Sequence, residues 1–194
     1  LRFFSIYKIE ILSLLSISFF YVILIVYWTH GKLLFGGDTV GYYNYYDFLQ
    51  NPSASTLFYA LAELIAFNNL YLMFYIHLFF GTLFNMIGVY ILSRLVINNV
   101  NGNDGKLFGI VSSLLYLFNP WSVSLTYLSL IYDVSFGSAG FTFFLIGVFL
   151  QLNSNMSKKL KKYSSVISGL GLGIALSPFP NYIRLLVVVI TIFF

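Results

Sequence analysis

Long apolar stretches occupy most of the chain, and short polar segments separate them. Stretches of about 18 to 25 nearly uncharged residues recur, which is the length an α-helix needs to cross a hydrocarbon layer about 30 Å thick. In lipid, every backbone polar group must be satisfied within the protein, and these stretches lack the alternation of a membrane β-barrel. The pattern therefore predicts an all-α, polytopic transmembrane helical bundle.

Polar and proline-containing breaks predict about five complete membrane spans and a truncated sixth. The predicted spans are Ile11–Tyr27, Leu70–Val96, a third from Leu107 to the break at Asn119 and Pro120, Phe136–Leu152, Ser164–Leu176, and the last run Leu185–Phe194. Because proline has no amide proton and its ring clashes with the preceding turn, Pro120 ends or interrupts the third span. In the fifth span, Gly169 and Gly173 form a small-xxx-small pair that would let another helix approach closely.

Residues 28–69, between the first two predicted spans, form a long mixed segment. Within it, Asn51 and Pro52 suit the N-cap and first turn of a helix that continues to about Phe67. The apolar run of this helix is too short to cross a membrane, so the helix is expected to lie at the interface or on the bundle. Residues 28–69 are therefore predicted to be a first outer loop with an interfacial helix.

Composition agrees with a membrane protein, since 59% of the residues are hydrophobic and 8% are charged, against roughly a quarter charged in a soluble domain. The chain has no cysteine, which excludes disulfides, thiolate metal sites and a cysteine nucleophile from this portion. The first residue is Leu1, and the last apolar run stops at Phe194 in mid-span. Both ends predict that residues 1–194 are the N-terminal part of a longer transmembrane domain.

Basic residues are distributed unevenly between the two predicted sides of the membrane. With the N-terminus in the cytoplasm, eight of the ten lie on the inner side, and only Lys32 and Arg184 lie outside. This asymmetry predicts a multi-pass protein of the cell membrane with a cytoplasmic N-terminus. The lysines at 158, 159, 161 and 162 set much of this topology and would attract anionic lipid. The net charge of +4 needs no nucleic-acid partner.

Acidic residues gather on the predicted outer side. Asp38 follows two glycines in the segment Leu34–Thr39, where the backbone can turn tightly and a carboxylate can bind a divalent cation or accept a proton. The alternative, an N-cap of a short helix through Tyr46, stays open. Asp133 lies in the second predicted outer loop, whereas Asp47 is expected to be a solvated helix residue.

Three other ionisable residues interrupt or border apolar runs. Arg184 could hold a lipid-linked phosphate through its forked donors, or it could snorkel at a span boundary. His77 lies inside the second predicted span, as a ligand or as a neutral imidazole bonded to a neighbouring helix. Glu63 is expected to point to the headgroup region.

The order of these features resembles the start of a GT-C type glycosyltransferase: a cytoplasmic N-terminus, one span, a long outer loop with an early aspartate, then closely spaced spans. The segments Gly37–Thr39 and Tyr116–Trp121 are similar to large members of that superfamily, including arabinofuranosyltransferase-like proteins. The resemblance implies a sugar donor on a polyprenyl phosphate, with transfer at the outer face.

The same resemblance implies roles for three residues. Asp38 would be the catalytic base or the ligand of a divalent cation, Mg²⁺ or Mn²⁺; Asp133 would support it; and Arg184 would bind the donor phosphate. The chain has no Asp-x-Asp or Glu-Asp pair at the first-loop position, so chemistry without a metal stays open.

Two non-enzymatic interpretations also stay open. A transporter or flippase subunit would line a path with His77 and with the helices broken near Pro120 and Pro178. A structural scaffold would have no site, and its outer carboxylates would scatter. Convergence of the outer-side candidates would distinguish an enzyme from both.

Overall fold

The computed structural model describes residues 8–28, 30, 61–67, 69–101, 105–119, 134–153 and 158–176. This part of the chain contains helices and no strand, so the all-α prediction is confirmed there. Its helices are α2 (Lys8–Trp28), α5 (Leu70–Asn101), α6 (Lys106–Leu117), α8 (Val134–Leu152) and α9 (Lys158–Leu176), with a short helical segment over 61–65. Two of them, α2 and α5, are long and apolar enough to cross a membrane.

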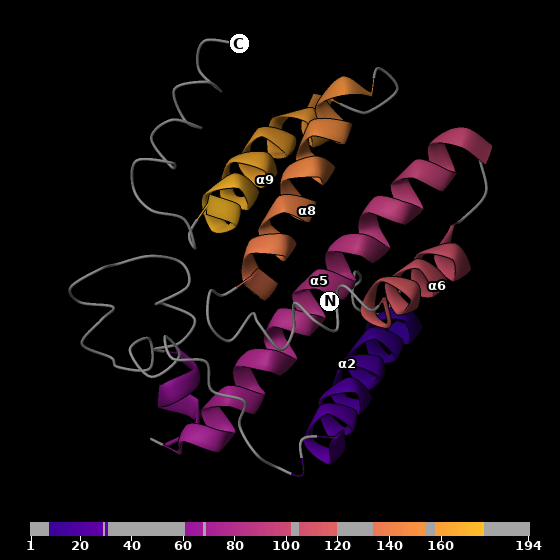
Figure 1. Cartoon of the computed structure of the whole chain (residues 1–194). Coiled ribbons are helices and arrows are strands. Elements are labelled where there is room, and N and C mark those ends of the chain that lie inside the picture. Colours follow the sequence, from indigo (N-terminus) through magenta and orange to yellow (C-terminus); the bar gives the residue numbers. More distant parts are fainter. Residues whose placement is uncertain are drawn as a thin grey trace.

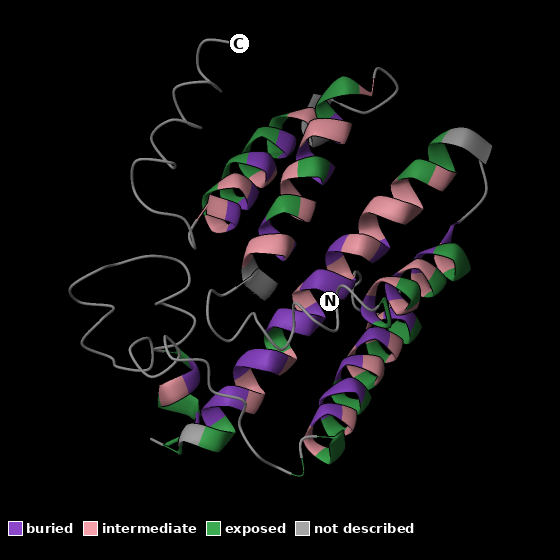
Figure 2. Ribbon diagram, in the orientation of Figure 1, coloured by how far each residue is buried: buried purple, intermediate pink, exposed green. Residues whose placement is uncertain are grey.

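Helix α5 lies at the centre of the arrangement (Figure 1). With 32 residues it is about 48 Å long. Helices α2 and α6 pack on one side of α5, α8 packs on the other, and α9 packs mainly on α8. Burial is highest along the middle of α5, while the outward sides of the surrounding helices are exposed (Figure 2).

Contacts along α5 fix the directions of α6 and α8. Moving along α6, the contacts fall at successively earlier positions of α5, so the two helices are antiparallel. These pairs are Tyr90–Gly109, Met86–Ser113 and Asn85–Tyr116. Moving along α8, the contacts fall at successively later positions, so α8 runs parallel to α5. These pairs are Asn85–Ser138, Gly88–Thr142 and Asn99–Asn153.

Contacts also fix the directions of the two remaining helices, α2 and α9. Helix α2 runs parallel to α6, since Glu10 and Lys106 meet at their first turns and Tyr21 contacts Phe118 near their last. Helix α9 runs antiparallel to α8. We call the end where α2, α6 and α9 begin the basic end. At the opposite end, the chain continues into residues 31–60, 120–133 and 177–194.

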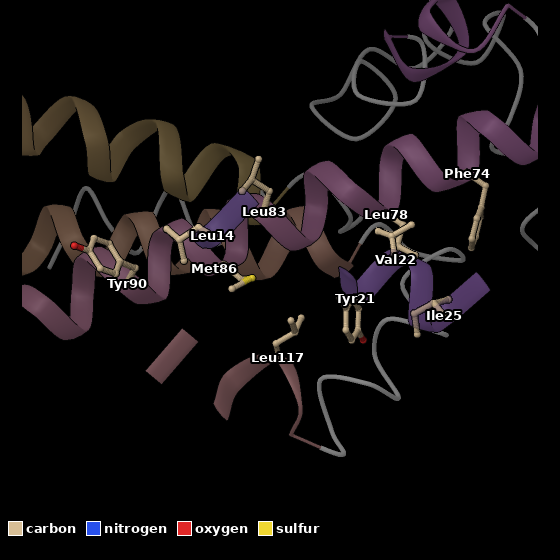
Figure 3. Close-up of a cluster of buried hydrophobic side chains, with 10 residues drawn as sticks. All are labelled: Leu14, Tyr21, Val22, Ile25, Phe74, Leu78, Leu83, Met86, Tyr90 and Leu117. Atoms are coloured by element: carbon tan, nitrogen blue, oxygen red, sulfur yellow. The ribbon is translucent and has the colours of Figure 1, made fainter. Parts of the chain in front are cut away.

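The main core joins α2, α5 and α6 (Figure 3). Met86 is 0% exposed and Leu78 is 2% exposed, both on α5. The buried positions of α2 recur at helical spacing on one face: Glu10, Leu14, Ser18, Tyr21, Val22 and Ile25. This face is no more apolar than the exposed one, because it includes a carboxylate and a hydroxyl.

The distribution of polarity is partly inverted relative to a soluble protein, although the core itself is mainly apolar. Uncharged polar side chains lie on buried faces: Ser18, His77, Thr82, Asn85, Ser113, Ser164 and Ser168 are all less than one tenth exposed. Large apolar side chains lie outside, and on α2 they include Phe19 and Phe20, at 62% and 57% exposed. Such a surface would be costly in water and is favourable in lipid.

Helix ends follow local chemistry. The Asn69 side chain caps α5 by accepting a hydrogen bond from the backbone N–H of Leu72 at 3.1 Å. Just before this cap, Phe67 has a positive φ of 51°, which stops the preceding helical segment, since an α-helix needs negative φ. Helix α6 ends at Leu117, shortly before Pro120, which disfavours helical geometry in the residue before it.

Two predicted boundaries were wrong. Helix α5 continues past Val96 to Asn101, and α9 begins at Lys158 instead of Ser164. The lysines at 158, 159, 161 and 162 thus belong to α9, because lysine is a good helix former despite unfavourable charge at a helix N-terminus. Of the predicted interfacial helix, only 61–67 is described, and the last run Leu185–Phe194 lies outside the described residues.

Helices α8 and α9 approach so closely that only glycine fits at their contact. A Cβ added to Gly140 would lie 2.7 Å from the Gly171 oxygen, and one added to Gly147 would lie 2.6 Å from the Ser168 nitrogen. A Cβ on Gly171 would meet the backbone of α8. The predicted pair, Gly169 and Gly173, does not make this contact, since no described atom lies within 4 Å of a Cβ at either position.

We expect opposite effects from alanine at two glycines of α9. Gly171→Ala should destabilise the protein by about 1–3 kcal/mol, because the new methyl group is forced into the α8 backbone. Gly173→Ala should be neutral or stabilising by up to about 1 kcal/mol, because the methyl group meets open space and alanine favours a helix. Denaturant titration of both variants in detergent micelles measures the difference; equal effects would contradict the described α8–α9 contact.

Candidate functional site

The three residues proposed from the sequence as a site lie outside the described part of the chain. They are Asp38, Asp133 and Arg184. Their convergence is therefore still a prediction. Asp133 directly precedes Val134, where α8 begins. Asp47 also lies outside the described residues.

The other two candidates are described. His77 lies inside α5 with 3% of its surface exposed, and Glu63 is half-buried in the helical segment over 61–65. Within the described ranges, no three histidine or acidic side chains gather as a metal site would require.

A buried polar cluster instead joins three helices at one point. Asn85 of α5 is 5% exposed, and its Oδ1 accepts hydrogen bonds from Ser138 Oγ of α8 at 2.7 Å and Tyr116 Oη of α6 at 3.1 Å. Its Nδ2 donates to the Gly81 oxygen at 2.9 Å. The two hydroxyl oxygens lie 3.4 Å apart. We call these three side chains the Asn85 cluster.

The chemistry of the Asn85 cluster is that of a neutral hydrogen-bonded junction. An amide oxygen has two lone pairs, and here it accepts from two hydroxyls on two different helices. The amide does not titrate, and the cluster contains no carboxylate or imidazole. Its geometry can therefore hold helices in register and offer hydroxyls as hydrogen-bond partners.

Position makes the cluster relevant to the predicted site. Tyr116 lies in the last turn of α6, and Ser138 lies near the start of α8. The cluster thus connects the end of α6 and the start of α8 to α5. The segment 120–133 joins these two helix ends along the chain. Tyr116 also opens the segment Tyr116–Trp121 on which the family resemblance partly rests.

Sequence reasoning missed Asn85 as a junction. The available signal was an amide within an otherwise apolar span, since polar groups inside membrane helices usually find partners. Its partners could not be found in the same way, because they lie 31 and 53 residues further along the chain.

A second polar contact lies deeper in the same interface. Ser113 Oγ donates to the Met86 oxygen of α5 at 3.0 Å and to the Gly109 oxygen of its own helix at 2.9 Å. Ser18 of α2 donates to the Met86 sulfur at 3.3 Å. Met86 is therefore the point where α2, α5 and α6 meet.

A buried carboxylate pairs with a lysine at the basic end. Glu10 Oε1 of α2 lies 3.3 Å from Lys106 Nζ of α6, with the glutamate side chain 7% and the lysine 42% exposed. A buried carboxylate needs such a partner, because desolvation alone would penalise its charge. The pair fixes α2 and α6 side by side at their first turns.

We expect the Asn85 cluster to be energetically coupled. Asn85→Leu should destabilise the protein by about 1–2 kcal/mol, since two partly buried hydroxyls lose their shared acceptor. Tyr116→Phe should lower the free energy of unfolding in both backgrounds. The loss should be smaller, by about 0.5–1.5 kcal/mol, in the Asn85→Leu background than in the natural sequence. A double-mutant cycle from denaturant titrations in micelles gives this coupling.

The matched control pairs Asn85→Leu with Ser168→Ala. Ser168 donates only within α9, to the Ser164 and Ser165 oxygens, so its effect should add to that of Asn85→Leu within about 0.5 kcal/mol. Additivity in both cycles would contradict a shared acceptor at Asn85.

Comparison with known proteins identifies no family for this chain. No protein-family model, no curated protein and no solved structure matches it. The functional interpretation therefore rests on the residues, the directions of the helices and the chemistry described above.

Proposed function

We propose that this chain belongs to a multi-pass membrane protein of the GT-C glycosyltransferase type, which transfers a sugar from a polyprenyl-phosphate donor at the outer membrane face. The proposal has three parts: placement in a membrane, orientation, and chemistry at one end of the bundle. A different set of residues supports each part.

The distribution of polar and apolar side chains between buried and exposed positions supports the placement in a membrane. Serine, threonine, asparagine and histidine side chains are buried between helices, while phenylalanine, leucine and isoleucine side chains cover the outside. Helix α2 shows this most clearly, since only 33% of its apolar window is buried. A core helix of a soluble protein would be mostly buried, so lipid is the solvent that suits this surface.

Helix lengths support several spans. Helices α2 and α8 have 21 and 19 residues and are about 28–32 Å long, close to the thickness of a hydrocarbon layer, whereas the apolar part of α9 after its lysines is about 21 Å long. Helix α6, with 12 residues, reaches only about 18 Å. The alternation of helix directions is the one that successive crossings of a membrane require.

The basic end supports a cytoplasmic N-terminus. Lys8, Arg94, Lys106, Lys161 and Lys162 all lie toward this end of the described bundle, two of them at the start of α9. Cytoplasmic flanks of membrane helices are enriched in lysine and arginine. The opposite end would then face outward.

The proposed chemistry lies at the opposite end, where the segments that carry Asp38, Asp133 and Arg184 connect to the described helices. Asp38 would take the proton of the acceptor hydroxyl, directly or through a bound divalent cation. The acceptor oxygen would then attack the anomeric carbon, and the polyprenyl phosphate would leave. Arg184 would stabilise the phosphate charge, and Asp133 would support the base.

We expect Asp38→Asn to abolish transfer. Removal of a general base typically costs about 10²–10⁴-fold in rate, so transfer from a labelled polyprenyl-phosphate arabinose donor in reconstituted vesicles should fall by at least about 100-fold. The matched control is Asp47→Asn, an identical change in the same predicted loop, which should alter the rate by less than about twofold because a solvated carboxylate makes no transition-state contact.

Other outcomes of this assay distinguish the alternatives. Equal loss in both variants would contradict a special role for Asp38. Movement of the labelled donor across the vesicle membrane without transfer would favour a flippase subunit. If the natural sequence showed no movement and no transfer, that result would favour a scaffold. A rate that survives chelation of Mg²⁺ and Mn²⁺ would remove the metal from the mechanism.

The orientation has a separate test, because the chain has no natural cysteine. Single cysteines at Lys8 and Trp28, which are both exposed, bracket α2. In intact cells, a membrane-impermeant maleimide should label Trp28→Cys and leave Lys8→Cys unlabelled until the membrane is permeabilised. The reverse pattern would invert the proposed topology.

A further inference from the structure

The lysines that open α9 have no use in the proposed chemistry. Lys161 is half-buried and Lys162 is exposed. Within the described ranges the only acids are Glu10, which is paired with Lys106, and Glu63. No described carboxylate pairs with either ammonium group, and both lie at the start of α9.

The packing of α9 against α8 fixes the depth of these lysines. Helix α8 is uncharged throughout and ends at Leu152, which is 80% exposed. Next to it, Gln151 Nε2 donates to Ser165 Oγ at 2.9 Å. The apolar surface of α8 thus ends at the level of Ser165, and Lys161 and Lys162 lie about 5 Å beyond that level along α9.

In the membrane placement of the proposed function, this level corresponds to the phosphate layer of a bilayer. The headgroup regions add about 5–7 Å to each side of the hydrocarbon core. The close backbone contacts at Gly140 and Gly147 prevent α9 from sliding along α8. The lysines are therefore held where lipid phosphates lie, and long flexible stems let their ammonium groups adjust.

An apolar stripe continues from the lysines along the same helix. Tyr163, Val166 and Leu170 are spaced by three and four residues and are 52%, 56% and 65% exposed. Lys162 and Val166 are four residues apart and so share this face. A cationic group followed by an exposed apolar stripe complements one lipid molecule. The headgroup would lie at Lys162, and an acyl chain would lie along the stripe.

We propose that the start of α9 is a binding site for an anionic phospholipid, with Lys162 on the phosphate and Tyr163, Val166 and Leu170 along an acyl chain; Lys161, about half a helical turn away from Leu170, lies on the opposite face. The site rests on the membrane placement in the proposed function and is independent of the sugar chemistry. It goes beyond the general attraction of a lysine run for acidic lipid, because it names one face of one helix.

The test uses the whole chain in vesicles, with a tryptophan probe beside the lysines. The two natural tryptophans, Trp28 and Trp121, are replaced by phenylalanine, and Tyr163→Trp supplies the only indole. Quenching by brominated phosphatidylglycerol is compared with quenching by brominated phosphatidylcholine. Since each basic residue near an anionic surface contributes about a fivefold preference, phosphatidylglycerol should be preferred by about five- to twentyfold.

Two variants separate charge from shape. Lys162→Gln should reduce the preference to within about twofold, Lys162→Arg should retain it, and Lys161→Gln, the matched control on the opposite face of α9, should change it less than Lys162→Gln does. Millimolar inorganic phosphate should compete only weakly, because free phosphate lacks the acyl chain. Strong competition would assign the site to a soluble phosphate and overturn the lipid.

The remaining outcomes fail in distinguishable ways. Equal quenching by both lipids overturns the anionic site and leaves the membrane placement intact. No quenching by either lipid shows that the introduced indole is not in contact with lipid, which overturns the membrane placement and the site together. Loss of transfer activity in Asp38→Asn bears on neither result.

Discussion

Helices surrounded by hydrocarbon cannot be held together by burial of apolar surface, because lipid is as apolar as the side chains it touches. Close backbone packing and hydrogen bonds must hold them instead. Each principal interface of this bundle uses one or both. Helices α8 and α9 meet at glycines 140, 147 and 171, α6 meets α5 at Gly109 against Tyr90, and the Asn85 cluster joins α5, α6 and α8. In lipid, this requirement would explain why glycines and hydrogen-bonded polar side chains lie between helices whose core is otherwise apolar, while large apolar side chains also cover the outside.

The same interfaces determine what lies at each end. Because the pairings fix each helix direction, the basic residues of α2, α5, α6 and α9 gather at one end, and the segments with the candidate acids join at the other. The Asn85 cluster has a special place in this arrangement, since its hydroxyls come from the end of α6 and the start of α8. A shared acceptor at Asn85 thus holds the two attachment points of residues 120–133 against the central helix.

Much of the fold was predictable from the sequence, and the limits have a physical cause. Helix positions follow from uncharged length, so the five predicted helices are found close to their expected places. Which face of each helix points inward does not follow, because these helices are apolar all round and the inward stripe of α2 includes Glu10 and Ser18. The spacing of Gly169 and Gly173 satisfies a packing motif, but α8 contacts the face of Gly171, where its own glycines fit.

The candidate site was less predictable, because catalytic roles depend on side chains brought together from distant segments. The resemblance assigns Asp38, Asp133 and Arg184 by position in the chain, and their convergence stays a prediction. Asn85 illustrates the general difficulty: the sequence marks it as a polar residue in a span, yet its partners come from two other helices. Only the directions and registers of α6 and α8 bring them within hydrogen-bonding distance.

The depth of the bundle in the membrane relates the basic end to the opposite end. In the membrane placement that we propose, helix α5, at about 48 Å, exceeds a 30 Å hydrocarbon layer by more than ten residues' rise and therefore tilts or protrudes. The apolar part of α9, from Tyr163 to Leu176, spans only about 21 Å, so its lysines are drawn toward the headgroups. Because α9 is locked to α8, and α8 to α5 through Ser138 and Asn85, a phosphate contact at Lys162 would set the depth of the whole bundle. That depth decides how far the opposite end emerges from the lipid, and therefore whether a polyprenyl phosphate lying in the membrane can reach it.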